Sequence, residues 1–516
     1  MNRRYLLSIW ALATGLFLLA GCSSVEKAAT KTCDQVMPNI VIIYADDMGY
    51  GDLACQNPDS KIPTPNLDKL AQEGLRFTDG HCSSGICSPS RYALLTGRYH
   101  WRVFHHVVTS FGQPRFEPER LTLPEMLKGK GYRTACIGKW HLGWDWNAIK
   151  KQNAKPVKAK GFLPEAFDWS KRIPGGPVDQ GFDYYFGDGT INFPPYCWIE
   201  NDRVLEAPTE SMTNGARTTQ EGTWGFRSGP MVRDWDFYKV LPTLTDKTVE
   251  WISQQENDQP FFLYFSLPSP HAPIIPNEEF QGRTEAGDYG DFMFQTDWVA
   301  GQVLKALDTK ELRDNTIVIF TSDNGPEKYA FERVRRHKHR SMGQLRGLKR
   351  DIWEGGHRVP FIVRWPGVIE PGRVSSTLIS QIDLMATLAE IIGFDLPGDA
   401  AEDSFNQLTL WQDNSDRTVV RREHVHNTFR NEYAFRKDNW ILIDHATGSM
   451  SVMPDWFIKE NNYDMMMPNG GLYNLNEDIG QRQNLIDSFP AKAAGLRQRL
   501  SEIRDKGYSA GRFENH

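Results

Sequence analysis

The chain has 516 residues, of which 40% are hydrophobic and 24% charged, and its formal net charge is -6 at pH 7. A chain of this size and composition can bury a large core, which excludes an intrinsically disordered protein. The mild excess of acidic residues argues against a nucleic-acid-binding surface, so local basic residues must meet any anionic ligand.

The N-terminal segment indicates targeting rather than a part of the fold. Two arginines precede an apolar run, residues 6–20, that is too short to span a bilayer comfortably. The run ends in "LAGC", which resembles the processing site of bacterial lipoproteins, where the cysteine, here Cys22, is lipidated. We expect a signal peptide over 1–21, a tether over 22–36, and an exported lipoprotein anchored to the membrane of the cell envelope, on its periplasmic side or outer surface. A plain cleaved secretory signal is the alternative.

Short apolar runs and helical periodicity alternate along most of the chain. The runs that predict buried parallel strands are residues 39–47, 132–141, 260–271 and 315–325. The stretches with helical periodicity are residues 66–74, 122–131, 244–255 and 291–310. This alternation predicts an α/β fold with a large doubly wound sheet, mixed but mainly parallel and flanked by helices.

The pattern changes after the Pro- and Gly-containing stretch at residues 395–406. Further along, the chain predicts antiparallel strands and a closing amphipathic helix, at residues 432–444, 470–478 and 491–507. We therefore expect a large α/β domain over 37–414 and a smaller C-terminal α+β domain over 415–516.

Each of the four predicted strands ends in polar residues. Because ligands of open α/β sheets bind beyond the carboxyl ends of the strands, one rim would receive Asp46, Asp47, Lys139, His141, His271, Asp323 and Asn324. Three carboxylates and an amide are suitable ligands for a hard divalent cation, Ca²⁺ or, less favoured, Mg²⁺. Taken singly, the aspartates are equally typical of helix caps and turns, and the histidines of ordinary loops. Their common position at one rim of the sheet favours a metal-binding site.

The stretch "CSPSRYALLTGR", residues 87–98, begins at the head of a predicted helix. Cys87 has three interpretations: a buried structural thiol, a disulfide with Cys82, or a thiolate stabilised by Arg91. The spacing of the seven cysteines is not typical of a disulfide framework. Residue chemistry alone leaves the three interpretations open.

The run from Cys87 to Arg91 resembles the signature of the type I sulfatases, members of the alkaline-phosphatase-like superfamily. In that family a sulfatase-maturating enzyme oxidises the cysteine to formylglycine, and Pro89 and Arg91 would belong to the tag that this enzyme reads. Similar segments, "GKWHLG", "LRGLKRDIWEGGHRVPFIVRWPG" and "LYNLNEDIGQRQNL", follow in the family's order. The resemblance therefore extends from about residue 37 to the C-terminus.

The resemblance implies a hydrolase for sulfuric esters and a role for each site position. Calcium would be held by Asp46, Asp47, Asp323, Asn324 and an oxygen of the converted Cys87. Arg91 and Lys139 would stabilise the formylglycine hydrate, and His141 would accept its proton. Lys139 and Lys349 would contact the sulfate, and His271 would protonate the leaving alcohol.

An enzyme of this kind on a lipid anchor resembles bacterial sulfatases that act on glycans, so we expect a sulfated carbohydrate as substrate. Aromatic residues at 181–202, with Trp144 and Trp146, either stack on sugar rings or belong to the core. The basic run at 333–340 either attracts a polyanionic glycan or is a solvated loop. His424 and His426 are further candidates for the pocket.

Two other functions remain open at this point. One is a phosphonate or phosphate ester hydrolase of the same superfamily, because calcium and lysines suit those substrates as well. The other is a degenerate glycan-binding lipoprotein, which the intact set of site positions disfavours.

Overall fold

The computed structural model describes residues 37–213, 215–219, 221–413 and 418–513. The predicted signal peptide, the tether and the lipidated Cys22 lie outside these described residues. No helix in the described part of the chain is long and apolar enough to cross a membrane.

A ten-stranded sheet forms the centre of the fold, in the order β15-β2-β14-β13-β1-β12-β4-β5-β6-β7. The four strands predicted from the sequence lie side by side and parallel in its middle: β13 (Thr316–Ser322), β1 (Asn39–Ala45), β12 (Phe261–Ser266) and β4 (Arg133–Lys139). A fifth strand, β5 (Tyr184–Gly189), continues the parallel block beyond β4. The prediction of a mixed, mainly parallel sheet is confirmed.

The edges of this sheet are antiparallel or short. On one side lie β14 (Phe361–Arg364), β2 (Leu75–Phe77) and β15 (Arg373–Ser375). On the other side lie β6 (Ile199–Glu200) and β7 (Arg203–Val204). Three two-stranded sheets complete this part of the chain: β3 (Gly80–His81) with β16 (Ile379–Ser380), β8 (Glu210–Met212) with β11 (Gly229–Met231), and β9 (Gly215–Thr219) with β10 (Gly222–Phe226).

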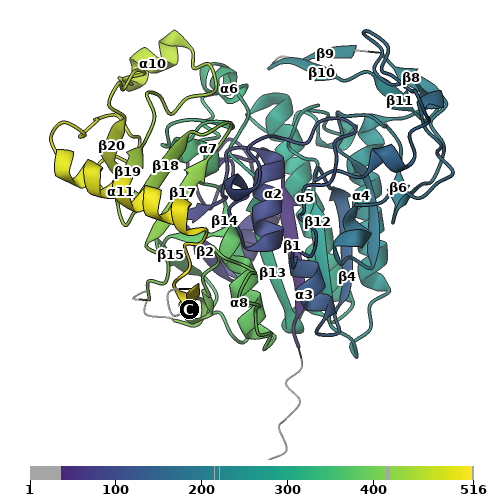
Figure 1. The fold of residues 1–516 in the computed structure, drawn as a ribbon, viewed down its shortest axis with the longest axis horizontal. Coiled ribbons are helices and arrows are strands. Elements are labelled where there is room, and N and C mark those ends of the chain that lie inside the picture. The colour runs from purple at the N-terminus through teal and green to yellow at the C-terminus, as the bar shows by residue number, and fades with distance from the viewer. Residues whose placement is uncertain (1–36, 214, 220, 414–417, 514–516) are drawn as a thin grey trace, which may run out of the picture. The chain divides into compact units, whose positions relative to one another are not determined.

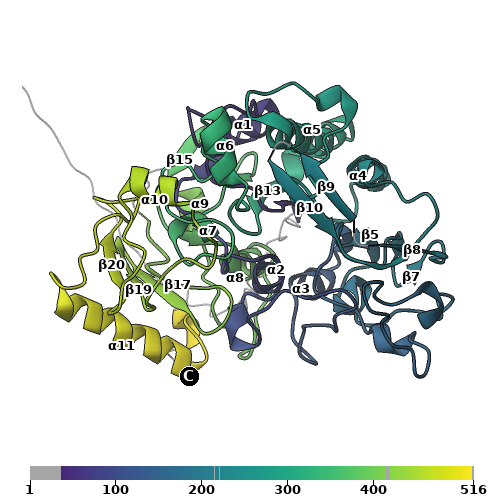
Figure 2. The same cartoon turned by 90° about the horizontal axis from the view of Figure 1, so that it is seen from above.

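Helices cover both faces of the central sheet (Figures 1 and 2). Alternate residues of β1 point to opposite faces, and Ile42 and Ile43 belong to two different apolar clusters. The first cluster includes residues of α2 (Cys87–Thr96), α3 (Leu123–Lys128) and α8 (Leu384–Ile391). The second includes residues of α1 (Pro65–Gln72), α4 (Val240–Ser253) and α5 (Gly287–Thr309). Two buried faces explain why the central strands are continuous apolar runs.

A separate four-stranded antiparallel sheet lies near the C-terminus. Its strands are β17 (Glu423–Asn427), β18 (Tyr433–Lys437), β19 (Trp440–Ile443) and β20 (Gly471–Asn474). The closing helix α11 (Pro490–Lys506) packs on it through Leu496 and Leu500. The predicted strands and helix of this region are confirmed, whereas the boundary at 414/415 stays a prediction because residues 414–417 are outside the described ranges.

Four short helices connect these parts: α6 (Ala330–His337), α7 (Glu354–His357), α9 (Leu408–Gln412) and α10 (Asp455–Asn461). Lys349 lies in the loop between α6 and α7, a segment that returns over the carboxyl ends of the parallel strands.

Candidate active site

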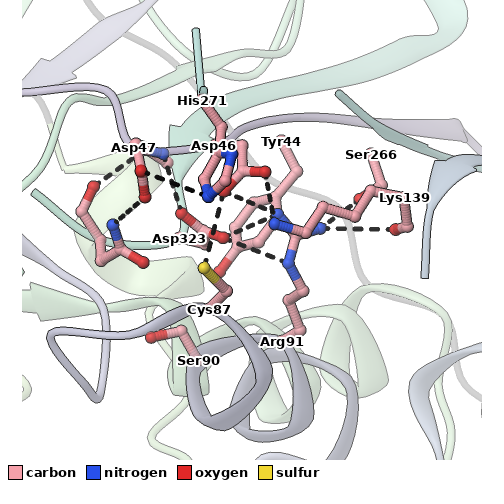
Figure 3. A network of polar contacts seen from close by, with 12 residues as sticks. Tyr44, Asp46, Asp47, Cys87, Ser90, Arg91, Lys139, Ser266, His271 and Asp323 are labelled. Atoms are coloured by element: carbon pink, nitrogen blue, oxygen red, sulfur yellow. Dashed lines mark hydrogen bonds and ion pairs between the residues drawn. The ribbon is translucent and has the colours of Figure 1, made fainter. Parts of the chain in front are cut away.

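The carboxyl ends of the parallel strands bring the predicted side chains together (Figure 3). Asp46 and Asp47 follow β1, Asp323 and Asn324 follow β13, and all four are at most 1% exposed. Lys139 ends β4, where the register shifts at Gly138. Gly138 has a φ of +107°, and a Cβ there would lie 2.0 Å from the carbonyl oxygen of Ser266. Only glycine therefore lets β4 and β12 approach at this point.

Helix α2 carries Cys87 at its first position and Arg91 one turn later. Residues four apart share one face of a helix, so both side chains face the strand ends. The Cys87 Sγ lies 3.7 Å from Asp46 Oδ1. Arg91 binds Asp323 with an Nη2 to Oδ2 distance of 2.7 Å and also donates to Ser266. Arg91 Nη2 also lies 3.7 Å from Asp46 Oδ1, so the spacing of the motif places the cysteine and the arginine beside the same aspartate.

The disulfide interpretation of Cys87 is wrong, because Cys87 and Cys82 are both free thiols in the structure. Burial and the nearby Asp323 raise the pKa of the Cys87 thiol to about 12. A raised pKa opposes the thiolate interpretation, because the nucleophilic form of cysteine is the anion.

Three carboxylates face three buried cations at this site. Lys139 Nζ lies 2.5 Å from Asp46 Oδ2, and Lys349 Nζ lies 2.5 Å from Asp47 Oδ1. Burial opposes ionisation of Asp46, but Lys139 and the other cations hold its pKa well below the usual value. Burial and the charge of Asp46 raise the pKa of Asp323 to about 6. Each lysine is paired with an aspartate, so a bound anion would compete with Asp46 for Lys139 and with Asp47 for Lys349.

The residues present fit a hard divalent cation. Asn324 donates its amide N–H to Asp47 Oδ1 at 2.7 Å, while its own Oδ1 is buried and has no partner. Ligand-capable atoms of Asp46, Asp47, Cys87 and His271 lie within 4.8 Å of one another. A buried set of carboxylate oxygens with a free amide oxygen is the chemistry that calcium prefers.

The two histidines of the site have assigned tautomers, because each donates to a backbone carbonyl. His141 Nε2 lies 2.8 Å from the carbonyl oxygen of Val108, which leaves Nδ1 as a lone-pair nitrogen without a partner. His271 Nδ1 lies 2.5 Å from the carbonyl oxygen of Ala272, and its Nε2 lies 3.6 Å from Asp47 Oδ2. Burial, with Lys139 as the second cause, lowers the pKa of His141 well below its usual value. Burial and the Lys349 cation lower the pKa of His271 to about 3.

A pocket of about 190 Å³ opens at these groups and is lined by Cys87, His141, His271 and Lys349. The lining also includes Trp224, Arg227, Tyr329, Arg350 and Phe429. The structure therefore brings every predicted catalytic side chain to the pocket or to the carboxylates beneath it.

Other sequence-based candidates lie elsewhere or serve the fold. Trp144 and Trp146 are each 4% exposed and pack in the core, which confirms the core interpretation, and both also line a small cavity next to His141. His424 and His426 do not line the pocket; their rings stack on each other, 4.2 Å apart and fully buried. In the basic run, Arg333 is buried and pairs with Glu221 at 2.9 Å.

Sequence reasoning missed two polar residues of the site. Ser266 ends β12 and accepts a hydrogen bond from Arg91. Asp188, near the end of β5, is 4% exposed, and neither of its carboxylate oxygens has a hydrogen-bond partner. Burial raises the pKa of Asp188 to about 7. The available signal was a polar residue closing a further short apolar run, "YYFGDG".

Comparisons with known proteins agree with this geometry. The family model "Sulfatase" matches residues 38–394, and a model for the C-terminal part of N-sulphoglucosamine sulphohydrolase matches residues 348–506. An N-acetylgalactosamine-6-O-sulfatase of Bacteroides thetaiotaomicron is 31% identical over 96% of this chain and 98% of its own. The human N-acetylgalactosamine-6-sulfatase is 32% identical over 73% of this chain and 66% of its own.

A solved structure from Bacteroides thetaiotaomicron, described with the metabolism of multiple glycosaminoglycans, superposes with a TM-score of 0.75 at 30% identity, covering 91% of this chain and all of that one. The family model spans most of the chain, and the sheet order and the strand-end site agree with it. The chain therefore belongs to the sulfatase family, within the alkaline-phosphatase-like superfamily, and is a sulfuric ester hydrolase.

Proposed function

We propose that the protein is a calcium-dependent sulfatase that removes sulfate from a sulfated carbohydrate through a formylglycine derived from Cys87. The observation that carries the proposal is the position of Cys87, buried at the head of α2 against Asp46, which also binds Lys139, and open to a pocket lined by Lys349, His141 and His271. Because two relatives are N-acetylgalactosamine 6-sulfatases, a 6-sulfated N-acetylgalactosamine is the first substrate to test.

Two groups would complete the site. The hydrate of formylglycine supplies two hydroxyls on one carbon, so that one can attack sulfur and the other can expel sulfate as the aldehyde re-forms. Calcium, held by Asp46, Asp47, Asp323 and Asn324, would offset negative charge on the sulfuryl oxygens.

The protein's own side chains position the ester and move the protons. Lys139 and Lys349 are buried cations, 0% and 3% exposed, that would bind the sulfuryl oxygens as charge develops. His141 would accept the proton of the attacking hydroxyl at its free Nδ1. Arg91 keeps Asp323 and Ser266 in place.

His271 would protonate the departing alcohol oxygen from Nε2 as the sulfur–oxygen bond breaks. Because Nδ1 already donates to Ala272, this role requires the imidazolium form. The negative charge of a bound sulfate ester favours that form.

We also propose how the enzyme is matured and where it is located. Maturation requires a sulfatase-maturating enzyme that reads the tag from Cys87 to Arg91 before the helix is buried. The "LAGC" sequence at Cys22 supports lipidation, export and a membrane anchor in the cell envelope.

The test combines mass spectrometry with turnover. Protein produced with the maturating enzyme should carry formylglycine at position 87 and release sulfate from 6-sulfated N-acetylgalactosamine faster than phosphate from the corresponding phosphate ester. Cys87→Ala should abolish turnover without lowering the Tm, and Cys55→Ala, at a partly exposed thiol away from the pocket, should leave turnover unchanged.

Four results would contradict the proposal. Activity of Cys87→Ala within about tenfold of the wild type would show that a formylglycine hydrate is not the nucleophile. Full activity after stringent chelation would show that the reaction does not require calcium. Preference for the phosphate ester would favour the phosphohydrolase alternative, and binding of the sugar without any turnover would favour the glycan-binding alternative.

A further inference from the structure

Strand β5 delivers a side chain to the same rim as the four predicted strands. It pairs in parallel with β4, and Lys139 is aligned with Gly189, the residue after Asp188. The fifth strand of the parallel block therefore also ends at the site, and it ends in a carboxylate that the proposed reaction does not use.

Asp188 is expected to lower the stability of the folded protein. Both its carboxylate oxygens are buried and have no hydrogen-bond partner among the described residues, and the residue is only 4% exposed. An unpaired buried carboxylate loses its hydration without compensation. Because such groups are rare in folded proteins, an unsatisfied one calls for a ligand.

A small cavity of about 30 Å³ lies beside Asp188. Its lining includes Ser110, His141, Trp144, Thr190 and Phe193. His141, Thr190 and Phe193 also line the pocket of Cys87, so the two spaces adjoin. A group bound in this cavity would lie next to the proposed proton acceptor.

Further buried polar atoms around this cavity and the adjoining pocket have no partner. Ser110 Oγ can donate and accept, and Asn192 Oδ1 can accept. Hydroxyl groups, which both donate and accept, complement such a mixed set. A second sulfate does not, because it could only accept and would be repelled by Asp188.

We propose that Asp188 is a specificity-determining residue that accepts hydrogen bonds from hydroxyl groups of the sulfated sugar. The proposal rests on the proposed function and deepens it. The preferred substrate is a sugar whose hydroxyls beside the sulfate ester are free, and a sugar sulfated at those positions is excluded. Phe193 lines both spaces and supplies apolar surface beside these hydroxyls, while the Arg227 guanidinium lies over its ring, 3.6 Å from the centroid.

Binding to the inactive protein tests the proposal without turnover. In a Cys87→Ala background, Asp188→Asn keeps the volume of the side chain and removes its charge. We expect the affinity for 6-sulfated N-acetylgalactosamine, measured by calorimetry, to fall roughly 10- to 100-fold, as for a lost hydrogen bond to a charged group. Asp246→Asn, the same substitution at an exposed position of α4, should change it less than about twofold.

A deoxy sugar separates recognition from a structural role. Analogues of the sulfated sugar that each lack one hydroxyl should bind the Asp188-containing protein roughly 10- to 100-fold more weakly for at least one position. Asp188→Asn should reduce that discrimination to less than about threefold, because the same hydrogen bond is then already lost. The Tm of Asp188→Asn should stay equal or rise, since an unpaired buried charge is removed.

Unchanged affinity in Asp188→Asn would overturn the proposal and indicate a cavity that holds only water. A lower Tm with undiminished discrimination between the sugars would show that Asp188 serves the fold. If 6-sulfated N-acetylgalactosamine binds through Asp188 but the matured enzyme releases no sulfate, the proposed function fails while this inference stands.

Discussion

Single side chains at this site are oriented by backbone contacts, and these contacts decide which atom faces the substrate. His141 donates Nε2–H to Val108, and His271 donates Nδ1–H to Ala272. Each ring therefore directs its other nitrogen away from the backbone, and the lone pair of His141 Nδ1 remains free. Two histidines of one site can thus have different roles although burial lowers both pKa values.

Replacement of His271 tests the general-acid role. An alkoxide leaves sulfur poorly, so His271→Ala should lower kcat/KM for a sulfated sugar by roughly 10²- to 10⁴-fold. A nitrophenolate needs little protonation, so kcat/KM for 4-nitrophenyl sulfate should fall far less. The comparison requires preparations with equal formylglycine content.

Lys349→Ala is the matched control, because Lys349 would bind the sulfate group that both substrates share. It should lower kcat/KM for both substrates to a similar extent. If His271→Ala did the same, His271 would not be the acid, and His141 would be the next candidate.

At the scale of elements, the C-terminal sheet is held to the catalytic part by buried polar contacts. Arg421, just before β17, pairs with Asp383, just before α8, at 2.5 Å, and both side chains are fully buried. Arg421 also donates to the carbonyl oxygen of Asp403 at 2.7 Å. Val425 of β17 and Ala93 of α2 belong to one apolar cluster, so this contact region reaches the helix that carries Cys87.

Arg421→Met should destabilise the protein strongly, because the buried Asp383 loses its cationic partner and keeps only neutral donors, the backbone N–H groups of Ser380 and Phe405 and the side-chain amide of Gln407. We expect a loss of about 3–5 kcal/mol in the free energy of unfolding, measured by urea denaturation. Arg422→Met is the neighbouring control: its partner Asp438 is 40% exposed, so the denaturation midpoint should not move. Equal midpoints for the two variants would show that the buried pair does not stabilise this contact.

At the scale of the whole molecule, buried histidines couple stability to pH. His357 of α7 and His426 of β17 stack with ring centroids 3.5 Å apart, and His424 stacks on the other side of His426. Burial lowers the pKa of His357 to about 3, and burial with the neighbouring histidines holds the pKa values of His424 and His426 well below 6.5. These rings join the catalytic part to the C-terminal sheet as neutral groups.

The contribution of these histidines to the free energy of unfolding should therefore fall as the pH falls from about 6.5 toward 3, and it acts against the raised pKa values of Asp188 and Asp323. In this window the unfolded chain binds protons that the folded protein does not, at a cost of up to about 1.4 kcal/mol per pH unit for each histidine. The Tm should accordingly drop between pH 7.5 and pH 5. His426→Gln should reduce the drop, and His445→Gln, at a side chain that is 37% exposed, should not.

An unchanged Tm across this pH range would show that these histidines are not kept neutral by the fold. A drop of the same size in His426→Gln and in the wild type would assign the pH dependence to other groups.

The sequence by itself determined the local features of this protein. Continuous apolar runs identified β1, β4, β12 and β13, because strands covered on both faces must be apolar throughout. The four-residue spacing of Cys87 and Arg91 is a helical period, so the motif could be assigned to one helix face. The aspartates were found because they follow strands directly, and the family resemblance named the positions that chemistry left ambiguous.

Only the tertiary structure decided which distant residues meet. Lys349 lies 302 positions from Asp47 and contacts it because a loop returns over the sheet, which no local pattern encodes. The histidine stack joins α7 to β17, and His424 and His426 are consequently absent from the pocket. Asp188 was missed because its assignment to the site depends on strand order. A single acidic residue after a short apolar run is common, and it indicates a site only when β5 is known to pair with β4. Side chains become a site only when the sheet brings their strand ends to one edge, and strand order is a property of the folded chain.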